Sequence, residues 1–278
     1  MISNKKFPRA PPKTGDFTPR GLYESSMTQQ NPESQWFGEE AVSPKEKTRK
    51  VIGVFDSVAS NYDIMNDVMS GGLHRLWKDR FVRKIRPQKG LHYLDVAGGT
   101  GDIAFRIRKK AGADCKITLC DLNTEMLRVG RDRALDKGYA DDFDWVTGNA
   151  EALPLPDASV DVYTIAFGLR NVTHIDTALR EALRVLKPGG RFYCLEFSKV
   201  REPFLAKIYD EYSYRLIPKM GELVAKDRDS YQYLVESIRK FPSQQELLQR
   251  MKAAGFGRCK VENLTFGVVA IHEGSRLS

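Results

Sequence analysis

The chain has 278 residues, of which 41% are hydrophobic and 29% are charged, so disorder throughout is excluded. No stretch approaches the roughly 18 consecutive apolar residues of a spanning helix. The net charge is +8, but the basic residues are interspersed with acids rather than gathered into a stripe, so we predict no nucleic-acid partner. The four cysteines form no C-x-x-C pair, which predicts reduced thiols and no metal site.

The N-terminal segment, residues 1–43, is rich in proline and poor in aliphatic side chains. Such a segment buries too little apolar surface to offset the entropy of ordering it, so we predict a flexible leader. Its first 23 residues carry far more lysine and arginine than acid, which is typical of an organelle transit peptide, although the prolines disfavour the usual amphipathic helix. Residues 44–278 are predicted to form a single domain.

Two helices are predicted at the start of this domain. Ser43 is a candidate N-cap, Pro44 suits the first helical position and Glu46 the third, and apolar residues follow at helical spacing, which predicts a helix over 44–60. A second apolar stripe predicts a helix over 73–85.

Strand-like and helical patterns then alternate along the chain. The predicted strands are 91–97, 116–122, 143–147, 160–167 and 191–197, and the predicted helices are 102–110, 124–137 and 174–186. A turn is expected over 187–190. The alternation predicts a parallel sheet with helices on both faces. Two further strand-like runs, 258–266 and 268–272, are joined only by Gly267 and should therefore pair antiparallel.

Residues 200–241 form an insertion that is too long for a plain connection and is rich in tyrosine. We predict that it is a helical cover over the edge of the sheet that carries the functional site. An ordinary packed helix pair without a substrate role is the alternative.

The segment 94–102, LDVAGGTGD, is the most informative stretch of the sequence. A strand ends there, glycines let the backbone approach a ligand, and a helix begins whose N-terminus favours an anion. An acid ends the next strand, where a carboxylate can accept hydrogen bonds from ribose hydroxyls, and residues 148–151 follow the third strand at the place of an adenine. The candidate cofactor-binding residues are Gly98, Gly99, Gly101, Asp121, Asn149 and Ala150.

Two classes of cofactor fit this loop. Residues 99–104 satisfy the dinucleotide fingerprint G-x-G-x-x-A, so an NAD-dependent oxidoreductase is one alternative, and a glycine turn with only a structural role is another. The loop also fits the D-x-x-x-G-x-G pattern of S-adenosylmethionine-dependent methyltransferases, which Asp95, Asn149 and the C-terminal hairpin favour. We therefore predict an α/β, Rossmann-like class I SAM-dependent methyltransferase with a seven-stranded, mostly parallel sheet, an antiparallel C-terminal hairpin and a helical cover.

Several segments resemble signatures of the ubiquinone/menaquinone biosynthesis C-methyltransferase family. They are 62–78 (YDIMNDVMSGGLHRLWK), 167–172 (FGLRNV), 184–190 (RVLKPGG) running into 195–199 (LEFSK), and 230–238 (SYQYLVESI). The resemblance covers residues from about 50 to 274. It is greatest to the mitochondrial branch of the family, which 37–38 and 42–43 also resemble.

This resemblance implies methyl transfer from S-adenosylmethionine to a ring carbon of 2-methoxy-6-polyprenyl-1,4-benzoquinol in ubiquinone biosynthesis. It also implies a cofactor contact at Thr100. A further contact, often serine in bacterial members, falls on Ala166, and the first usual loop glycine is replaced by Ala97. A menaquinone-type (demethylmenaquinol) methylase and a scaffold subunit of a quinone-biosynthesis complex remain the alternatives.

Methylation at carbon requires an electron-rich ring, which the quinol becomes as its oxygen loses a proton. Arg170 follows the fourth strand, where a guanidinium can stabilise the developing phenolate but is a poor base. We assign proton acceptance to Tyr62, Asp67 or His74, directly or through water. Structural roles compete for these residues, because Asp67 can cap a turn, His74 can lie on a helix face and Arg170 can pair with a carboxylate of the sheet.

The expected partners are the polyprenyl benzoquinol substrate and a quinone-biosynthesis multiprotein complex, with a homodimer left open. A lipid substrate together with the positive charge predicts peripheral association with an anionic membrane. The resemblance places the protein in the mitochondrion, on the matrix side of the inner membrane.

Overall fold

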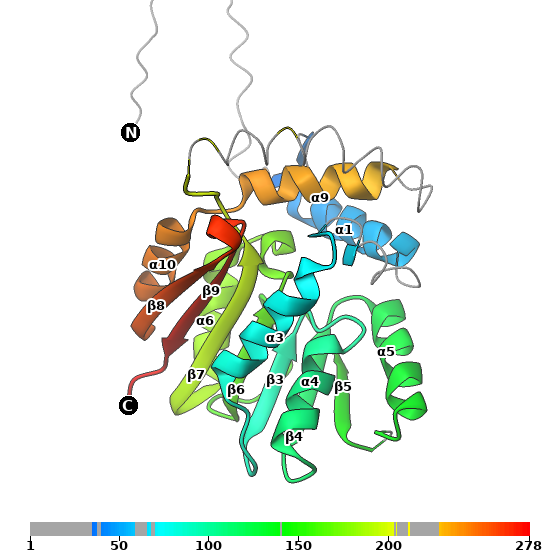
Figure 1. Cartoon of the computed structure of the whole chain (residues 1–278), viewed down its shortest axis with the longest axis vertical. Helices are drawn as coiled ribbons and strands as arrows, with labels where there is room; N and C mark the ends of the chain where they lie inside the picture. Colours follow the sequence, from blue (N-terminus) through cyan, green and yellow to red (C-terminus); the bar gives the residue numbers. More distant parts are fainter. Residues whose placement is uncertain are drawn as a thin grey trace, which may run out of the picture. The chain divides into compact units, whose positions relative to one another are not determined.

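A seven-stranded sheet organises the domain (Figure 1). The computed structural model describes residues 35–37, 40–58, 66–67, 70–139, 141–202, 204, 211 and 228–278. The strands of the sheet are β3 (His92–Val96), β4 (Lys116–Asp121), β5 (Phe143–Thr147), β6 (Val160–Ala166), β7 (Leu186–Phe197), β8 (Gly257–Leu264) and β9 (Val269–Ser275). Their spatial order is β5-β4-β3-β6-β7-β9-β8. The first five strands in this order, β5, β4, β3, β6 and β7, are mutually parallel, and β9 runs antiparallel to β7 and β8. The predicted sheet architecture is confirmed.

Helices cover both faces of this sheet. They are α1 (Pro44–Val58), α3 (Leu73–Ile85), α4 (Asp102–Ala111), α5 (Thr124–Asp136), α6 (Ile175–Val185), α9 (Arg228–Lys240) and α10 (Gln244–Ala253). Successive residues of a strand point to opposite faces of the sheet. On one face Tyr93 of β3 packs in the apolar cluster that contains Phe81 of α3, and on the other face Leu94 packs in the cluster that contains Leu179 of α6. Burying each large apolar side chain stabilises the fold by about 1.5–3 kcal/mol.

Helices α1 and α9 lie next to each other at the end of the sheet that carries the functional site (Figure 1). α1 begins as predicted, because the Ser43 hydroxyl accepts a hydrogen bond from the Glu46 backbone N–H at 3.3 Å. α9 supplies the described helical part of the predicted 200–241 cover, and its Tyr231 is fully buried. Most of 203–227 lies outside the described residues.

The ordered domain begins before the predicted boundary at residue 44. β1 (Gln35–Phe37) and β2 (Glu40–Val42) form an antiparallel pair inside the segment predicted to be a flexible leader. The Phe37 ring stacks on Tyr233 of α9, with ring centroids 4.4 Å apart and an interplanar angle of 15°. This packing against a distant helix orders the pair. The leader prediction for residues 1–34 lies outside the described residues.

Two predicted element boundaries also differ from the structure. The turn expected over 187–190 is part of β7, whose pairing with β6 shifts between Val160 and Val162. Gly190 O accepts a hydrogen bond from Arg276 N and Gly189 N donates one to Arg276 O, both at 2.9 Å, so the residue directly after β9 holds this segment extended. The C-terminal strands are connected by a 3₁₀ turn, η4 (Thr265–Gly267), rather than by Gly267 alone.

Two further features of the described residues are the state of the cysteines and the character of the helices. All four cysteines are free, and Cys120 and Cys194 are buried. Within the described part of the chain, none of the helices combines the length and the apolar character needed to cross a bilayer.

Candidate functional site

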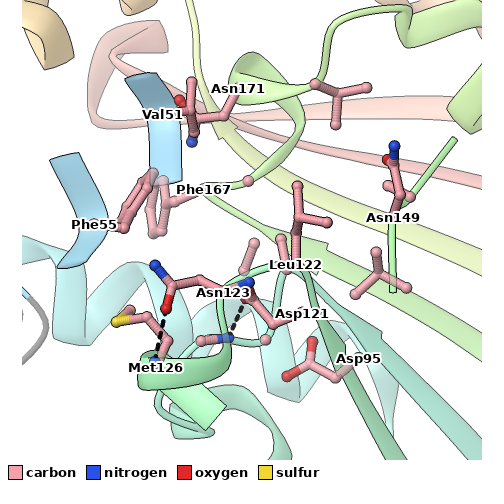
Figure 2. A pocket seen from close by; sticks show the side chains of 18 of the residues that line it. Val51, Phe55, Asp95, Asp121, Leu122, Asn123, Met126, Asn149, Phe167 and Asn171 are labelled. Atoms are coloured by element: carbon pink, nitrogen blue, oxygen red, sulfur yellow. Dashed lines mark hydrogen bonds between the residues drawn. The ribbon is translucent and has the colours of Figure 1, made fainter. Parts of the chain in front are cut away.

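A cavity of about 140 Å³ opens at the carboxyl ends of β3, β4 and β6 and beside the segment after β5 (Figure 2). Parallel strands bring these ends together, although they are distant in sequence. The cavity is lined by six of the seven predicted cofactor-binding residues: Gly98, Gly99, Thr100, Asp121, Asn149 and Ala150. The seventh, Gly101, is the N-cap residue of α4 directly behind the loop.

The loop between β3 and α4 depends on its glycines. Gly99 and Gly101 have φ angles of +53° and +85°, the left-handed region that side chains disfavour. A Cβ at Gly98 would lie 2.6 Å from Leu119 Cγ, so this residue must be glycine for a different reason, close packing against β4. Ala97 also has a positive φ, +50°, at the position where the resemblance leads one to expect glycine.

Asp121 at the end of β4 organises the loop and faces the cavity (Figure 2). Its Oδ2 accepts a hydrogen bond from Gly99 N and its Oδ1 from Asn123 N, both at 2.8 Å. Burial raises the pKa of Asp121, and these backbone N–H groups oppose the rise. Each carboxylate oxygen can accept a second hydrogen bond, so the pair can receive two ribose hydroxyls.

Asp95 at the end of β3 has an unsatisfied oxygen beside the cavity (Figure 2). Its Oδ1 accepts a hydrogen bond from the Thr164 hydroxyl at 2.8 Å, whereas its buried Oδ2 has no partner among the described residues. Burial raises the pKa of Asp95 to about 7. A buried acceptor without a donor is destabilising, and the α-amino group of S-adenosylmethionine would supply the missing donor and a positive charge.

The segment after β5 forms the other end of the cavity. Asn149 Oδ1 accepts a hydrogen bond from the Glu151 backbone N–H at 2.9 Å, which orients the amide group. Its Nδ2 has no partner among the described residues and is available to an adenine. Leu122 and Ala150 add apolar wall on which a flat base can pack.

Several residues that line the cavity were not predicted from the sequence (Figure 2). Val51 and Phe55 come from α1; their apolar spacing predicted the helix but not the surface it would face. Asn123 caps α5 by accepting a hydrogen bond from Met126 N at 2.9 Å. Asn171 lies within the quoted motif FGLRNV, so the motif was the available signal.

Asn171 is held by α9. Its Oδ1 accepts a hydrogen bond from the Tyr233 hydroxyl at 3.0 Å. Tyr233 is itself buried under Phe37. The side-chain amide of Asn171 is therefore oriented by α9, and Tyr233 of α9 is in turn covered by Phe37 of the β1 and β2 pair.

The exit of β6 is closely packed. Ala166 lines the cavity and offers no hydroxyl, as its sequence position implied. Phe167 has a φ angle of +56°, an uncommon conformation that costs energy and is frequent at functional sites. A Cβ at Gly168 would lie only 2.4 Å from the Cβ of Ala97. The two loops that bound the cavity therefore touch at this point.

Arg170 lies directly behind the cavity wall. Its side chain is only 3% exposed, and its Nη1 donates to Glu196 Oε1 at 3.1 Å and to the carbonyl of Phe167. Burial raises the pKa of Glu196, and the Arg170 guanidinium opposes that rise. Arg170 does not line the cavity, but its neighbours Phe167 and Asn171 do. The alternative pairing with a sheet carboxylate is thus observed.

Two of the other predicted catalytic residues, Asp67 and His74, are not brought to this cavity. Asp67 accepts two hydrogen bonds from Arg75, at 2.9 and 2.6 Å, and this contact lowers its pKa. His74 Nδ1 lies 3.0 Å from the Ser70 hydroxyl, and burial lowers the pKa of His74 to about 4. Neither residue lines the cavity. Tyr62 lies outside the described residues.

Solved structures share this fold. A SAM-dependent methyltransferase from Thermotoga maritima superposes with a TM-score of 0.57 at 22% sequence identity, covering 81% of this chain and 99% of that one. At this identity the similarity shows the fold alone, and it confirms the predicted fold class.

Two curated relatives are much closer in sequence. One is 2-methoxy-6-polyprenyl-1,4-benzoquinol methylase, mitochondrial, from Xenopus laevis, which is 48% identical over 287 residues, 91% of this chain and 93% of that protein. The other is the ubiquinone/menaquinone biosynthesis C-methyltransferase UbiE of Brucella abortus, which is 56% identical over 243 residues, 87% of this chain and 90% of that protein.

A family model covers nearly the whole described domain. The model of the ubiE/COQ5 methyltransferase family matches residues 43–276, from the cap of α1 to the residue after β9. The match includes all seven strands and every described residue that lines the cavity. The chain therefore belongs to the ubiE/COQ5 methyltransferase family.

Proposed function

We propose that this methyltransferase transfers a methyl group from S-adenosylmethionine to the ring carbon of 2-methoxy-6-polyprenyl-1,4-benzoquinol. The observation that carries this proposal is the 48% identity, over 91% of the chain, to a relative named for that substrate. The Brucella relative is named for both ubiquinone and menaquinone biosynthesis, so a demethylmenaquinol is the second candidate acceptor.

The residues of the cavity fit the cofactor at three points. Asp121 can accept hydrogen bonds from the ribose hydroxyls, the orphaned Oδ2 of Asp95 can accept one from the α-amino group, and Asn149 can donate to the adenine. When bound, the cofactor supplies an electrophilic methyl group. The chain's own contribution is to hold the acceptor carbon in line with that methyl group.

The Arg170 and Glu196 pair is our candidate for electrostatic assistance. Arg170 is a buried cation next to two residues of the cavity wall, where the dielectric is low and a phenolate that develops on the substrate is stabilised. Replacing Arg170 alone would leave Glu196 buried and unpaired. Arg170→Gln combined with Glu196→Gln avoids that defect, and we expect it to lower kcat while leaving the affinity for S-adenosylmethionine within about twofold.

Proton acceptance remains with Tyr62, Asp67 or His74 as a proposal. The placements of Asp67 and His74 give it no support, because neither reaches the cavity and Asp67 is held by Arg75. Tyr62 lies outside the described residues, so these contacts do not bear on it and it remains the candidate proton acceptor.

We also propose a mitochondrial location, peripheral at the matrix side of the inner membrane, and membership in a quinone-biosynthesis complex, with a homodimer as one assembly. The name of the Xenopus relative supports the organelle. The net charge of +8 supports attraction to an anionic surface.

The direct test is methyl transfer by the purified protein. The protein is incubated with S-adenosylmethionine and a short-chain 2-methoxy-6-prenyl-1,4-benzoquinol kept reduced, and a demethylmenaquinol is offered in a parallel reaction. We expect mass spectrometry to show one methyl group added to a ring carbon of the benzoquinol. Methylation of the demethylmenaquinol alone, or no transfer to either acceptor, would contradict the proposal.

A further inference from the structure

A second cavity, of about 550 Å³, lies on the other side of the wall formed by Val172 and Thr173, which line both cavities. It is bounded by the first turn of α1, the first turn of α6, the end of α9 and the side of α10. We call it the basic cavity, because it is lined by five cationic side chains and one carboxylate, besides His174. These residues are Lys47, Arg170, Arg180, Lys240, Arg250 and Asp176.

Lys47 is a buried cation that forms no ion pair with any described residue. It is 7% exposed, and among the described residues its ammonium makes one hydrogen bond, to Val172 O at 3.1 Å. No described carboxylate lies within ion-pair distance of it. Burial lowers the pKa of Lys47, and the charge of the Glu151 carboxylate, which lies beyond ion-pair distance, opposes this shift only in part. A buried ammonium with unused donors is costly to the fold unless an anion compensates for it.

Arg170 contributes a second buried cation to the basic cavity. Its guanidinium is satisfied on one side by Glu196, but its buried Nε has no partner among the described residues. Two buried cations therefore border the same cavity, Lys47 from α1 with a single hydrogen bond and Arg170 from the turn after β6 with an unpartnered Nε among the described residues.

The rim of the basic cavity adds positive charge, and the described acidic groups near it are already paired. Arg180 is exposed and bonds only to the Thr177 hydroxyl, at 3.1 Å, among the described residues. Asp176 is already bonded to Arg250, at 3.2 Å, and His174 to Glu151, at 2.7 Å. The first turn of α6, which has no side-chain cap, faces the same space and favours an anion further.

We propose that the basic cavity binds a phosphate group, carried either by a phospholipid headgroup or by a soluble phosphate ester. A doubly charged group with several acceptor oxygens matches lysine and arginine donors better than a single carboxylate does. A cavity of this size also holds part of the molecule that carries the phosphate. Because Val172 and Thr173 border both cavities, the site adjoins the methyl-transfer site without belonging to it.

The test uses the full chain and two probes, inorganic phosphate by calorimetry and vesicles by sedimentation. Lys47→Met removes the buried charge at nearly constant volume, and Arg180→Gln removes a rim charge from an exposed position, where folding is not at risk. We expect each variant to bind phosphate about tenfold more weakly or worse. Arg83→Gln, an exposed change on α3 away from the cavity, is the matched control and should bind as the wild type does.

Vesicles distinguish the two sources of phosphate. If the source is a lipid headgroup, phosphatidylcholine vesicles that contain phosphatidylglycerol sediment the wild type, and Arg180→Gln weakens this binding more than Arg83→Gln does. If the source is soluble, phosphate binds but the two variants sediment equally. The proposal is wrong if the wild type binds neither probe, or if Arg83→Gln loses as much phosphate affinity as Arg180→Gln does.

Discussion

Asp95 shows how one residue couples the cofactor site to the stability of the fold. The residue is 1% exposed, and one carboxyl oxygen lacks a partner among the described residues. In the folded protein it keeps its proton up to about pH 7, whereas in the unfolded chain it releases the proton near about pH 4. The folded state therefore binds the additional proton between these values, and this contribution to stability is lost as the pH rises through about 7.

We predict that Asp95→Asn alters the pH dependence of unfolding. Without cofactor, the unfolding free energy of the wild type should fall, relative to that of the variant, by up to about 1.4 kcal/mol per pH unit between about pH 4 and about pH 7. The comparison with the variant is needed because the lowered pKa of His74 gives both proteins an opposite slope in this range. Urea unfolding across that range measures it. Asp144→Asn, at an exposed position on β5, is the control. Parallel pH profiles of wild type and Asp95→Asn would contradict the assigned burial effect.

Ala97 and Gly168 form a second residue-scale test. Ala97→Gly removes the strain of an alanine held in the left-handed backbone region, which should raise the unfolding free energy by about 1–2 kcal/mol. The greater flexibility of glycine in the unfolded chain offsets part of this gain. Gly168→Ala places two Cβ atoms in collision and should destabilise by about 1–3 kcal/mol. In the double variant the collision is absent, so we expect chemical denaturation to show recovery of most of that loss. Strict additivity of the two changes would argue against the contact.

At the scale of elements, the short β1 and β2 pair depends on tertiary packing. Isolated hairpins of this length are marginal in water. Phe37 stacks on Tyr233, and the Lys50 ammonium lies 5.3 Å from the centre of the Phe37 ring. The pair is thereby linked through Tyr233 to Asn171 in the cavity wall.

Phe37→Ala should therefore release this pair from α9. We expect faster hydrogen exchange at the backbone amides of β1 and β2, while the amides of β3 to β7 keep their protection. Phe266→Ala, which removes an aromatic ring that is 70% exposed, is the matched control. Unchanged exchange in β1 and β2 would show that the aromatic stack does not hold the pair.

The elements that were predicted from the sequence carry strong local signals. The runs that became β3 and β6 are apolar and flanked by turn residues, and α1 has both a cap and a helical stripe. β1 and β2 have neither signal, since their three-residue strands lie beyond a proline-rich segment and are held by a tyrosine nearly 200 positions away. Local patterns do not record such a contact.

At the scale of the whole molecule, site residues that belong to one strand-loop-helix unit were predicted from the sequence, whereas those that distant helices bring to the cavity were not. Gly98, Gly99 and Asp121 belong to a strand-loop-helix unit whose geometry is local or nearly so. Val51 and Phe55 reach the same cavity only because α1 packs across the ends of the strands. For Arg170, position on the chain predicted proximity to the site and left pairing with a sheet carboxylate as an alternative; the partner, Glu196, and the burial of the pair depend on packing that local sequence does not record.

Binding of S-adenosylmethionine to the cavity between β3, β4 and the segment after β5 is the claim on which the functional account rests. Asp121→Asn keeps the size of the side chain but turns an amide donor toward the Gly99 or the Asn123 N–H group. Asp132→Asn, at an exposed position on α5, is the matched control.

The most direct measurement is a calorimetric titration of S-adenosylmethionine into these three proteins. We expect the wild type and Asp132→Asn to bind one equivalent with equal affinity, and Asp121→Asn to bind at least about tenfold more weakly. A wild type that does not bind S-adenosylmethionine, or an Asp121→Asn variant that binds it as tightly as the wild type, would contradict the account.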